Sequence, residues 1–154
     1  MPIRCEIVSQ DRMVFEGDVD IVVLPGADGE MGILPNHAPV LSTLKLGVIK
    51  VRRQGQEEIF TVTGGIVEVQ PHIVTVLADA AENIEEIDLA RAEAARERAE
   101  ERLAEGPPPD PDAYLAIESA LRRSNLRLEA ARRFRSGRAR IPQRQVDEPG
   151  SDSN

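Results

Sequence analysis

The stretch Pro25-Gly-Ala-Asp-Gly-Glu-Met-Gly-Ile-Leu-Pro-Asn-His-Ala-Pro39 joins two apolar segments in the first third of the chain. It holds three glycines and three prolines, with a single glutamate, Glu30, and a single histidine, His37, between them. Glycine permits backbone angles that other residues avoid, and proline fixes φ, so such a run specifies one backbone path. We therefore expect an ordered loop that presents a surface to a partner.

On both sides of this loop the sequence alternates between apolar and polar residues, as half-buried β-strands do. The apolar sets are Ile3, Cys5 and Ile7; Val19, Ile21 and Val23; Phe60 and Val62; Val67 and Val69; and Val74 and Val76. Turn signals separate them at residues 16–18, 28–29, 54–56, 64–65 and 71–72. Many short strands broken in this way predict an antiparallel β-sandwich or barrel over residues 1–86, rather than a parallel α/β sheet.

The pattern changes near residue 85, where strong helix formers begin. Residues 88–104 predict a helix with Asp88 as its N-cap, and residues from 111 or 112 to Phe134 predict a second one. Their apolar stripes are narrow: Ala92, Ala95, Ala99 and Leu103 on the first; Tyr114, Ile117, Leu121 and Leu128 on the second, interrupted by Ser124. Gly106 and the prolines that follow separate them. We expect a mobile α-helical hairpin over residues 87–135 and a disordered tail over 136–154.

Charge and composition exclude several functions. The 154 residues carry a net charge of −8, and only 3% of them are aromatic, which argues against a nucleic-acid partner. The lone Cys5 cannot form an internal disulfide, and the separated His37 and His72 predict no zinc site. No stretch approaches the roughly 20 apolar residues that span a bilayer, and the N-terminal sequence resembles neither a signal nor a transit peptide.

Nothing in the sequence forms a catalytic constellation, which favours a binding or regulatory protein. Adjacent pairs such as Glu57-Glu58 and Glu85-Glu86 are typical of solvated turns. Arginine is more informative, because every basic residue in 87–154 is an arginine. Arg91 and Arg98 share a broad helix face with Asp88, and Arg123 and Arg127 lie one turn apart on the second helix. If the hairpin closes over these faces, four guanidinium groups converge on a polyphosphate; otherwise they pair with glutamates on solvated faces.

Four segments together resemble the epsilon subunit of rotary F-type ATP synthase. They are Pro25-Gly-x-x-Gly-Glu-Met-Gly-Ile-Leu-Pro-x-His-Ala-Pro39, Leu46-Gly-Val-Ile49, Gly64-Gly-Ile-Val-Glu-Val-Gln-Pro71 and Val74-Thr-Val-Leu-Ala-Asp79. Their order and spacing match the family over residues 2–134. The resemblance implies a β-sandwich followed by a helix hairpin, in a non-catalytic subunit of the central stalk that couples proton-driven c-ring rotation to ATP synthesis.

The resemblance also implies partners for the opening stretch. Glu30, Met31 and Gly32 match the family loop that touches the c-ring, and His37 matches a position near the gamma subunit. The alternatives are an exposed loop acid for Glu30 and a turn histidine bonded to backbone for His37. The chain would lie at the cytoplasmic face of a bacterial plasma membrane, held peripherally through the complex.

The hairpin resembles the family's regulatory element, which inhibits ATP hydrolysis when it extends toward the catalytic alpha and beta subunits. Its inhibitory helix would carry Arg122, Arg123, Arg127, Arg132 and Arg133. Ile87-Asp-Leu-Ala-Arg-Ala92 resembles the motif of bacterial epsilon subunits that bind ATP as a regulatory ligand, with no obligatory cofactor and no metal. The matching positions are Glu82, Ile87, Asp88, Arg91, Ala92, Arg98, Arg123 and Arg127.

One departure and two alternatives remain. Prolines 107–109 differ from the polar turn usual in the family, and a stiff linker would tilt the helices or resist extension.

The chain could instead be a free-standing ATP-sensing protein that uses the arginine face. It could also be a β-sandwich enzyme or sugar-binding module that uses Glu30, although a second carboxylate, aromatic residues and metal ligands are missing.

Overall fold

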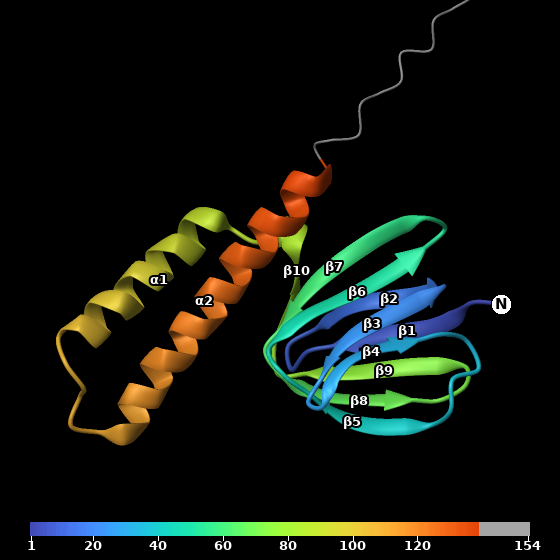
Figure 1. The fold of residues 1–154 in the computed structure, drawn as a ribbon, viewed down its shortest axis with the longest axis horizontal. Helices are drawn as coiled ribbons and strands as arrows, with labels where there is room; N and C mark the ends of the chain where they lie inside the picture. The colour runs from blue at the N-terminus through green and yellow to red at the C-terminus, as the bar shows by residue number, and fades with distance from the viewer. Residues whose placement is uncertain (139–154) are drawn as a thin grey trace, which may run out of the picture.

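The computed structural model describes residues 1–138, in which ten strands form one curved sheet and two helices pack beside it (Figure 1). The strands are β1 (Ile3–Val8), β2 (Met13–Val19), β3 (Ile21–Gly26), β4 (Gly29–Ile33), β5 (Val40–Leu44), β6 (Gly47–Arg53), β7 (Gln56–Val62), β8 (Gly65–Val69), β9 (Ile73–Ala78) and β10 (Ala81–Asn83). The helical elements are η1 (Ile84–Glu86), α1 (Leu89–Ala104) and α2 (Pro111–Arg138).

The sheet folds into two layers, which confirms the predicted sandwich. Its strand order is β10-β7-β6-β3-β5-β8-β9-β1-β2, and β4 pairs with β3 beside this path. The two halves of the sheet meet where β3 pairs with β5, and these two strands share a single register pair, Gly26 with Leu44. One pairing differs from the antiparallel expectation, because β1 runs parallel to β9.

The core lies between the layers and consists of the alternating residues that the sequence pattern singled out. Ile3, Cys5 and Ile7 of β1 have no exposed surface, and Phe60 of β7 is the bulkiest of the fully buried side chains. The Phe60 ring meets that of Phe15 edge-on, with centroids 5.6 Å apart and an interplanar angle of 62°. With so few aromatic residues, the packing otherwise depends on aliphatic side chains that interdigitate.

Two expectations about turns were wrong. Residues 16–18, predicted as a turn, lie inside β2, where Gly17 is buried and pairs with Cys5 of β1. The stretch 25–39 is not one loop: Pro25 and Gly26 end β3, residues 29–33 form β4, and only residues 34–39 connect to β5. Gly29 turns the chain at a φ of 138°, which L-residues rarely adopt, so the glycine indicates a hairpin rather than an irregular path.

The helices form where the sequence predicts them. Asp88 is the N-cap of α1, and its Oδ1 accepts a hydrogen bond from the Arg91 backbone N–H at 3.1 Å. α2 extends to Arg138, beyond the expected end at Phe134, so residues 136–138 are helical and that part of the tail prediction was wrong. A single Gly137 within Ser-Gly-Arg weakens a helix without ending it. The rest of the predicted tail, 139–154, lies outside the described residues.

The hairpin rests on the sandwich through the second half of α2 (Figure 1). Ala130 and Ala131 are buried against Ile59 of β7 and against Ile84 and Ile87 of the connection between the domains. Small alanines let the helix backbone approach the sheet closely. The predicted stripe of α2 is therefore only partly used: Leu128 is buried, whereas Tyr114 is 36% exposed.

Cys5 provides a pH-dependent probe of the sandwich. Burial, together with the charge of Glu6, raises the pKa of the Cys5 thiol from 9.0 to about 12. The unfolded chain therefore loses this proton before the folded chain does. We expect the free energy of unfolding to fall by about 1.4 kcal/mol per pH unit between these pKa values. Urea unfolding at pH 8, 9.5 and 11 measures it, and Cys5→Ala should show a shallower fall; equal slopes in both proteins would contradict the prediction.

Candidate functional site

A pocket at the junction of the sandwich and the hairpin brings together most of the residues predicted to bind a polyphosphate. It has a volume of about 520 Å³, within the usual range of small-molecule sites. Predicted residues that line it are Glu82, Asp88, Arg91, Arg98 and Arg127, and the other lining residues are Glu86, Ala94 and Ala95. β10, the start of α1 and the middle of α2 thus each contribute side chains.

A second pocket, of about 360 Å³, adjoins the first and shares Glu82, Ala95 and Arg127 with it. It lies between α2 and the strands β7 and β10, and Arg123 lines it. Its remaining lining is mostly small and weakly polar: Thr61, Thr63, Ala80, Ala81, Ala120, Ser124 and Leu126. The two pockets together form a charged compartment beside a less polar one.

An ion pair between Glu82 and Arg127 stands where the two pockets meet. Arg127 Nε donates to Glu82 Oε1 at 2.6 Å, and Arg127 Nη2 donates to Oε2 at 3.3 Å. Both side chains are about 30% exposed, and the planar fork of arginine suits this two-point contact. The pair connects β10 to α2, so the site depends on the docked position of the hairpin.

The other three arginines that were predicted to bind the polyphosphate do not form such an ion pair. Arg91, Arg98 and Arg123 are exposed, and within residues 1–138 none of them forms an ion pair. Their guanidinium groups are therefore available to an anion. The alternative of solvated pairing does apply to two arginines of the predicted inhibitory helix: Arg122 lies 3.7 Å from Glu118 and Arg132 lies 3.0 Å from Glu93.

Two predicted residues support the site rather than line it. Ile87 is 4% exposed and Ala92 is fully buried, so their side chains belong to the packing beneath the pocket. Ala92 lets α1 approach its neighbours closely, and Ile87 packs with Ala130 and Ala131 of α2. The two residues thereby hold Asp88 and Arg91 in position at the start of α1.

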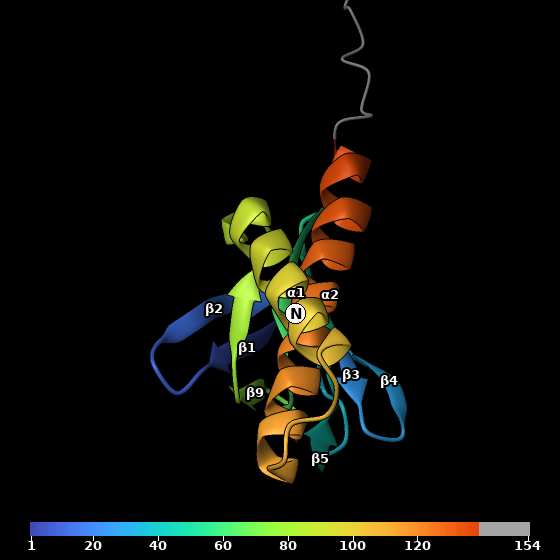
Figure 2. The same ribbon diagram turned by 90° about the vertical axis from the view of Figure 1, so that its left-hand side faces the viewer.

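The residues predicted to touch the c-ring lie on the β3–β4 hairpin, which projects from the side of the sandwich (Figure 2). Glu30 and Gly32 are exposed and Met31 is half-buried. β4 pairs only with β3, so its outer edge is unpaired among the described strands. His37 lies apart, in the connection to β5, and its Nδ1 is 2.8 Å from the Ala38 carbonyl oxygen, as the turn interpretation expects.

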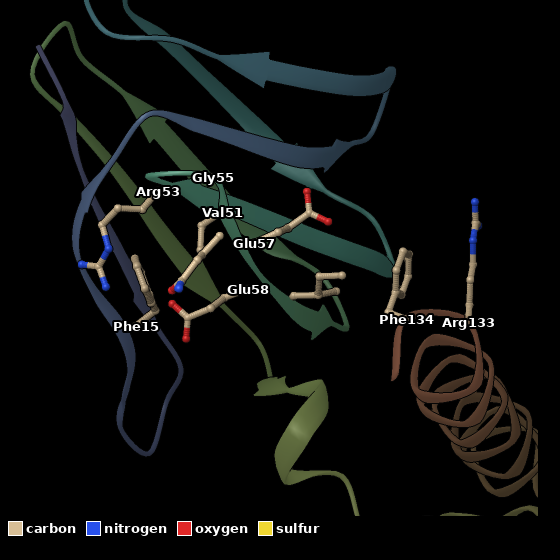
Figure 3. A pocket seen from close by; sticks show the side chains of 10 residues that line it. Phe15, Val51, Arg53, Gly55, Glu57, Glu58, Arg133 and Phe134 are labelled. Carbon is tan, nitrogen blue, oxygen red and sulfur yellow. The ribbon is translucent and has the colours of Figure 1, made fainter. Parts of the chain in front are cut away.

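A pocket of about 870 Å³ lies elsewhere, between the β6–β7 hairpin and the end of α2 (Figure 3). Phe15, Val51 and Ile59 provide apolar surface in it, and Glu57 and Glu58 provide carboxylates. Of the residues that the sequence predicted to bind a ligand or a partner, only Arg133 lines it. The charges of its lining are mixed, because Arg53 and Arg133 line the pocket together with the two glutamates, so the pocket favours no single class of ligand.

Sequence reasoning missed an apolar row on the outer face of the sandwich. Ile66, Leu77, Val8 and Met13 lie side by side across β8, β9, β1 and β2 in register. Ile66 is 46% exposed, Leu77 56% and Met13 46%. The sequence did contain a signal for this row, because its residues are apolar and occupy the strand positions that alternate with the buried core residues. A contiguous exposed apolar row of this kind is typical of a protein–protein contact.

The described residues hold no group of three or more potential metal ligands. None of the helices within residues 1–138 combines the length and the apolar character that crossing a bilayer requires. The fold and the site together define a two-domain protein in which a helical hairpin docks on a β-sandwich beside an arginine-lined pocket.

Comparison with known proteins identifies the family. Residues 2–84 match the β-sandwich domain of the ATP synthase delta/epsilon chain, and residues 85–132 match its long α-helix domain. The chain is 44% identical over 133 residues to an ATP synthase epsilon chain of Dehalococcoides mccartyi, covering 86% of this chain and 94% of that one. It is 45% identical over 130 residues to that of Bacillus licheniformis, covering 84% and 98%.

Solved structures of ATP synthases contain chains with the same fold. A chain of the Euglena gracilis mitochondrial ATP synthase superposes with a TM-score of 0.69 at 27% identity, over 84% of this chain and 81% of that one. A chain of the Tetrahymena thermophila mitochondrial ATP synthase, from its central stalk and c-ring, shares the fold with a TM-score of 0.55 at 14% identity, over 85% and 97%. The chain belongs to the ATP synthase delta/epsilon chain family, as an epsilon subunit. The identification made from sequence motifs is confirmed, and the chain is a subunit of the complex rather than its catalytic chain.

Proposed function

We propose that this chain is a central-stalk subunit that transmits c-ring rotation and inhibits ATP hydrolysis through a hairpin sensitive to ATP. One observation carries the regulatory part: arginines from both helices, with a glutamate from the sandwich, line two adjoining pockets at the domain junction. A ligand that bridges these elements binds only the folded, docked hairpin. It therefore shifts the equilibrium toward docking.

ATP is the ligand that this arrangement fits. Its phosphates require several cationic donors, and Arg91, Arg98 and Arg123 have guanidinium groups without ion-pair partners in residues 1–138. Its adenosine requires a less polar compartment, such as the one lined by Thr61 and Ala81. No catalytic role follows for the chain, because bound ATP acts here only by stabilising one conformation.

The inhibitory role follows from the same arginines when the hairpin extends. In the docked state Arg127 is paired with Glu82, and Arg132 is paired with Glu93. Undocking separates Arg127 from Glu82 and opening the hairpin separates Arg132 from Glu93. Together with Arg122, Arg123 and Arg133, they give α2 a positive face that suits acidic surfaces of the catalytic alpha and beta subunits.

Two further surfaces serve assembly. The projecting β3–β4 hairpin, with Glu30, Met31 and Gly32, touches the c-ring. The apolar row of Ile66, Leu77, Val8 and Met13 contributes to the gamma contact, together with the region of His37. The bacterial epsilon chains among the relatives support peripheral attachment at the cytoplasmic face of a bacterial plasma membrane.

Replacing Arg123 by alanine should weaken ATP binding to the isolated full-length chain. A hydrogen bond to a charged group is worth roughly 1.5–3 kcal/mol, so we expect a loss of about 10- to 150-fold in affinity. Calorimetric titration with ATP measures it. Arg102→Ala removes the same charge from an exposed position outside both pockets and should bind ATP as the unaltered chain does. Equal affinities in all three proteins would exclude Arg123 from the site.

The whole proposal is tested by ATP hydrolysis in the matching catalytic core. The full chain, or a chain ending at residue 86, is added at low and at high ATP, with binding of each confirmed by co-purification. Inhibition by the full chain alone, relieved at high ATP, is expected. Equal rates with both chains would remove the inhibitory role, and failure of both to co-purify with gamma would favour the free-standing sensor.

A further inference from the structure

The end of α2 makes a contact with the connection between the domains that is separate from the ATP pockets. Arg135 Nη2 donates hydrogen bonds to the backbone carbonyls of Ile84 and Ile87, the latter at 2.8 Å. These carbonyls flank η1, the short turn through which the chain passes from the sandwich to the hairpin. Arg135 lines neither of the two pockets at the junction.

The same turn is also held from the sandwich. Glu86 of η1 accepts a hydrogen bond from Arg12, in the connection between β1 and β2, at 3.0 Å. Ile84 and Ile87 are buried against Ala130 and Ala131 of α2. The connection is therefore fixed on one side by the sandwich and on the other by the last turns of α2.

Phe134, the neighbour of Arg135, strengthens this end of the interface. Lys50 of β6 places its Nζ 5.0 Å from the centre of the Phe134 ring, and Arg133 approaches the ring within 5.3 Å. Figure 3 shows Phe134 beside the strands of the sandwich, with Arg133 extending on the side away from them. A cation near an aromatic face is stabilising, so both residues 134 and 135 favour the docked helix.

Arg135 also carries a cost that makes its contact reversible. Its Nε is buried and has no hydrogen-bond partner within the described part of the chain. A buried donor without a partner loses the hydration it would have in water. Undocking restores the hydration of Nε but removes the two carbonyl contacts of Nη2. The guanidinium group therefore favours undocking through Nε and docking through Nη2. The two carbonyl contacts involve a charged donor, and such bonds outweigh neutral ones.

We infer that Arg135 holds the hairpin in its docked position by binding the carbonyls of Ile84 and Ile87. The contact links the far end of α2 to the hinge itself, so α2 leaves the sandwich only when these two hydrogen bonds break. ATP and Arg135 then stabilise the same docked state from two places. Only the statement about ATP rests on the proposed function.

Hydrogen exchange of the full-length chain, followed by mass spectrometry, measures undocking even when it is rare. We compare the unaltered chain with Arg135→Ala, Arg135→Lys and the control Arg102→Ala. Exchange in residues 84–88 and 126–135 should be about tenfold faster in Arg135→Ala. It should be intermediate in Arg135→Lys, because lysine keeps the charge but its side chain is shorter than that of arginine, whose Nη2 donates both hydrogen bonds. Arg102→Ala and the strands β7 and β9 should be unchanged.

Unchanged exchange in those two segments of Arg135→Ala would overturn the inference. If Arg135→Ala also loses protection in the strands, its fold is disturbed and Arg135→Lys becomes the test of the inference. Loss of protection by Arg135→Lys in residues 84–88 and 126–135 alone supports the contact. Exchange of Arg135→Lys at the rate of the unaltered chain overturns it. Saturating ATP should restore protection in Arg135→Ala. If ATP protects not even the unaltered chain, the proposed ATP site is wrong, while the result for Arg135 stands.

Discussion

Replacing Leu77 by glutamate is expected to abolish binding of this chain to the gamma subunit while its thermal stability stays nearly unchanged. Leu77 is 56% exposed at the centre of the apolar row, beside Ile66 of β8 and Val8 of β1. In the free chain a glutamate there remains hydrated. In an interface it becomes an unpaired, desolvated carboxylate, which costs several kcal/mol.

We expect the loss in affinity for gamma to exceed roughly a hundredfold, equivalent to about 3 kcal/mol. Surface plasmon resonance with immobilised gamma measures it, and thermal melts show that the sandwich is intact. Leu115→Glu is the matched control, because Leu115 of α2 is 55% exposed and lies outside the row. Gamma binding retained by Leu77→Glu at the strength of Leu115→Glu would show that the row is not the gamma surface.

The parts of the fold predicted well from sequence are those in which local pattern and packing agree. Period-two alternation predicted that Ile3, Cys5 and Ile7 are buried, and the strong helix formers after Asp88 predicted α1 with its cap. The parts predicted badly depend on pairing between distant segments. Gly17 indicates a turn when read locally, yet it is a strand residue because β1 provides its partner across the ladder.

In the candidate site, too, features set by local spacing were predicted and contacts between distant segments were not. Spacing along the helices placed Arg91 and Arg98 on one face. The family resemblance placed Glu82 and Arg127 among the ATP-binding positions, but their ion pair joins residues 45 positions apart and was not predicted. The role of Arg135 could not be predicted, because the expected helix ended at Phe134 and the partners of Arg135 are backbone carbonyls. The apolar row was not predicted, because the alternating pattern was used to find the buried residues of each strand, and the row lies at the exposed positions between them.

Gly65 is the position where a single methyl group should cost most. Its φ is 135°, and a Cβ atom there would lie 2.2 Å from the carbonyl oxygen of Leu77 and 2.9 Å from the Cα of Ala78. Both are backbone atoms of β9, the strand paired with β8, so no side-chain rotation relieves the clash. The two strands must separate, and the core residues Val67 and Val76 lose their packing.

We expect Gly65→Ala to lower the free energy of unfolding by about 3 kcal/mol or more, as urea unfolding would measure. Gly55→Ala is the control: Gly55 also has a positive φ, 77°, but a methyl group there would have no other atom within 4 Å, so only the backbone cost of about 1 kcal/mol applies. Because β9 carries Leu77, Gly65→Ala should lose gamma binding together with stability, whereas Leu77→Glu loses binding alone. Equal stabilities for the two alanine variants would mean that β8 and β9 tolerate separation, and the rigid outer face required for the gamma contact would then be in doubt.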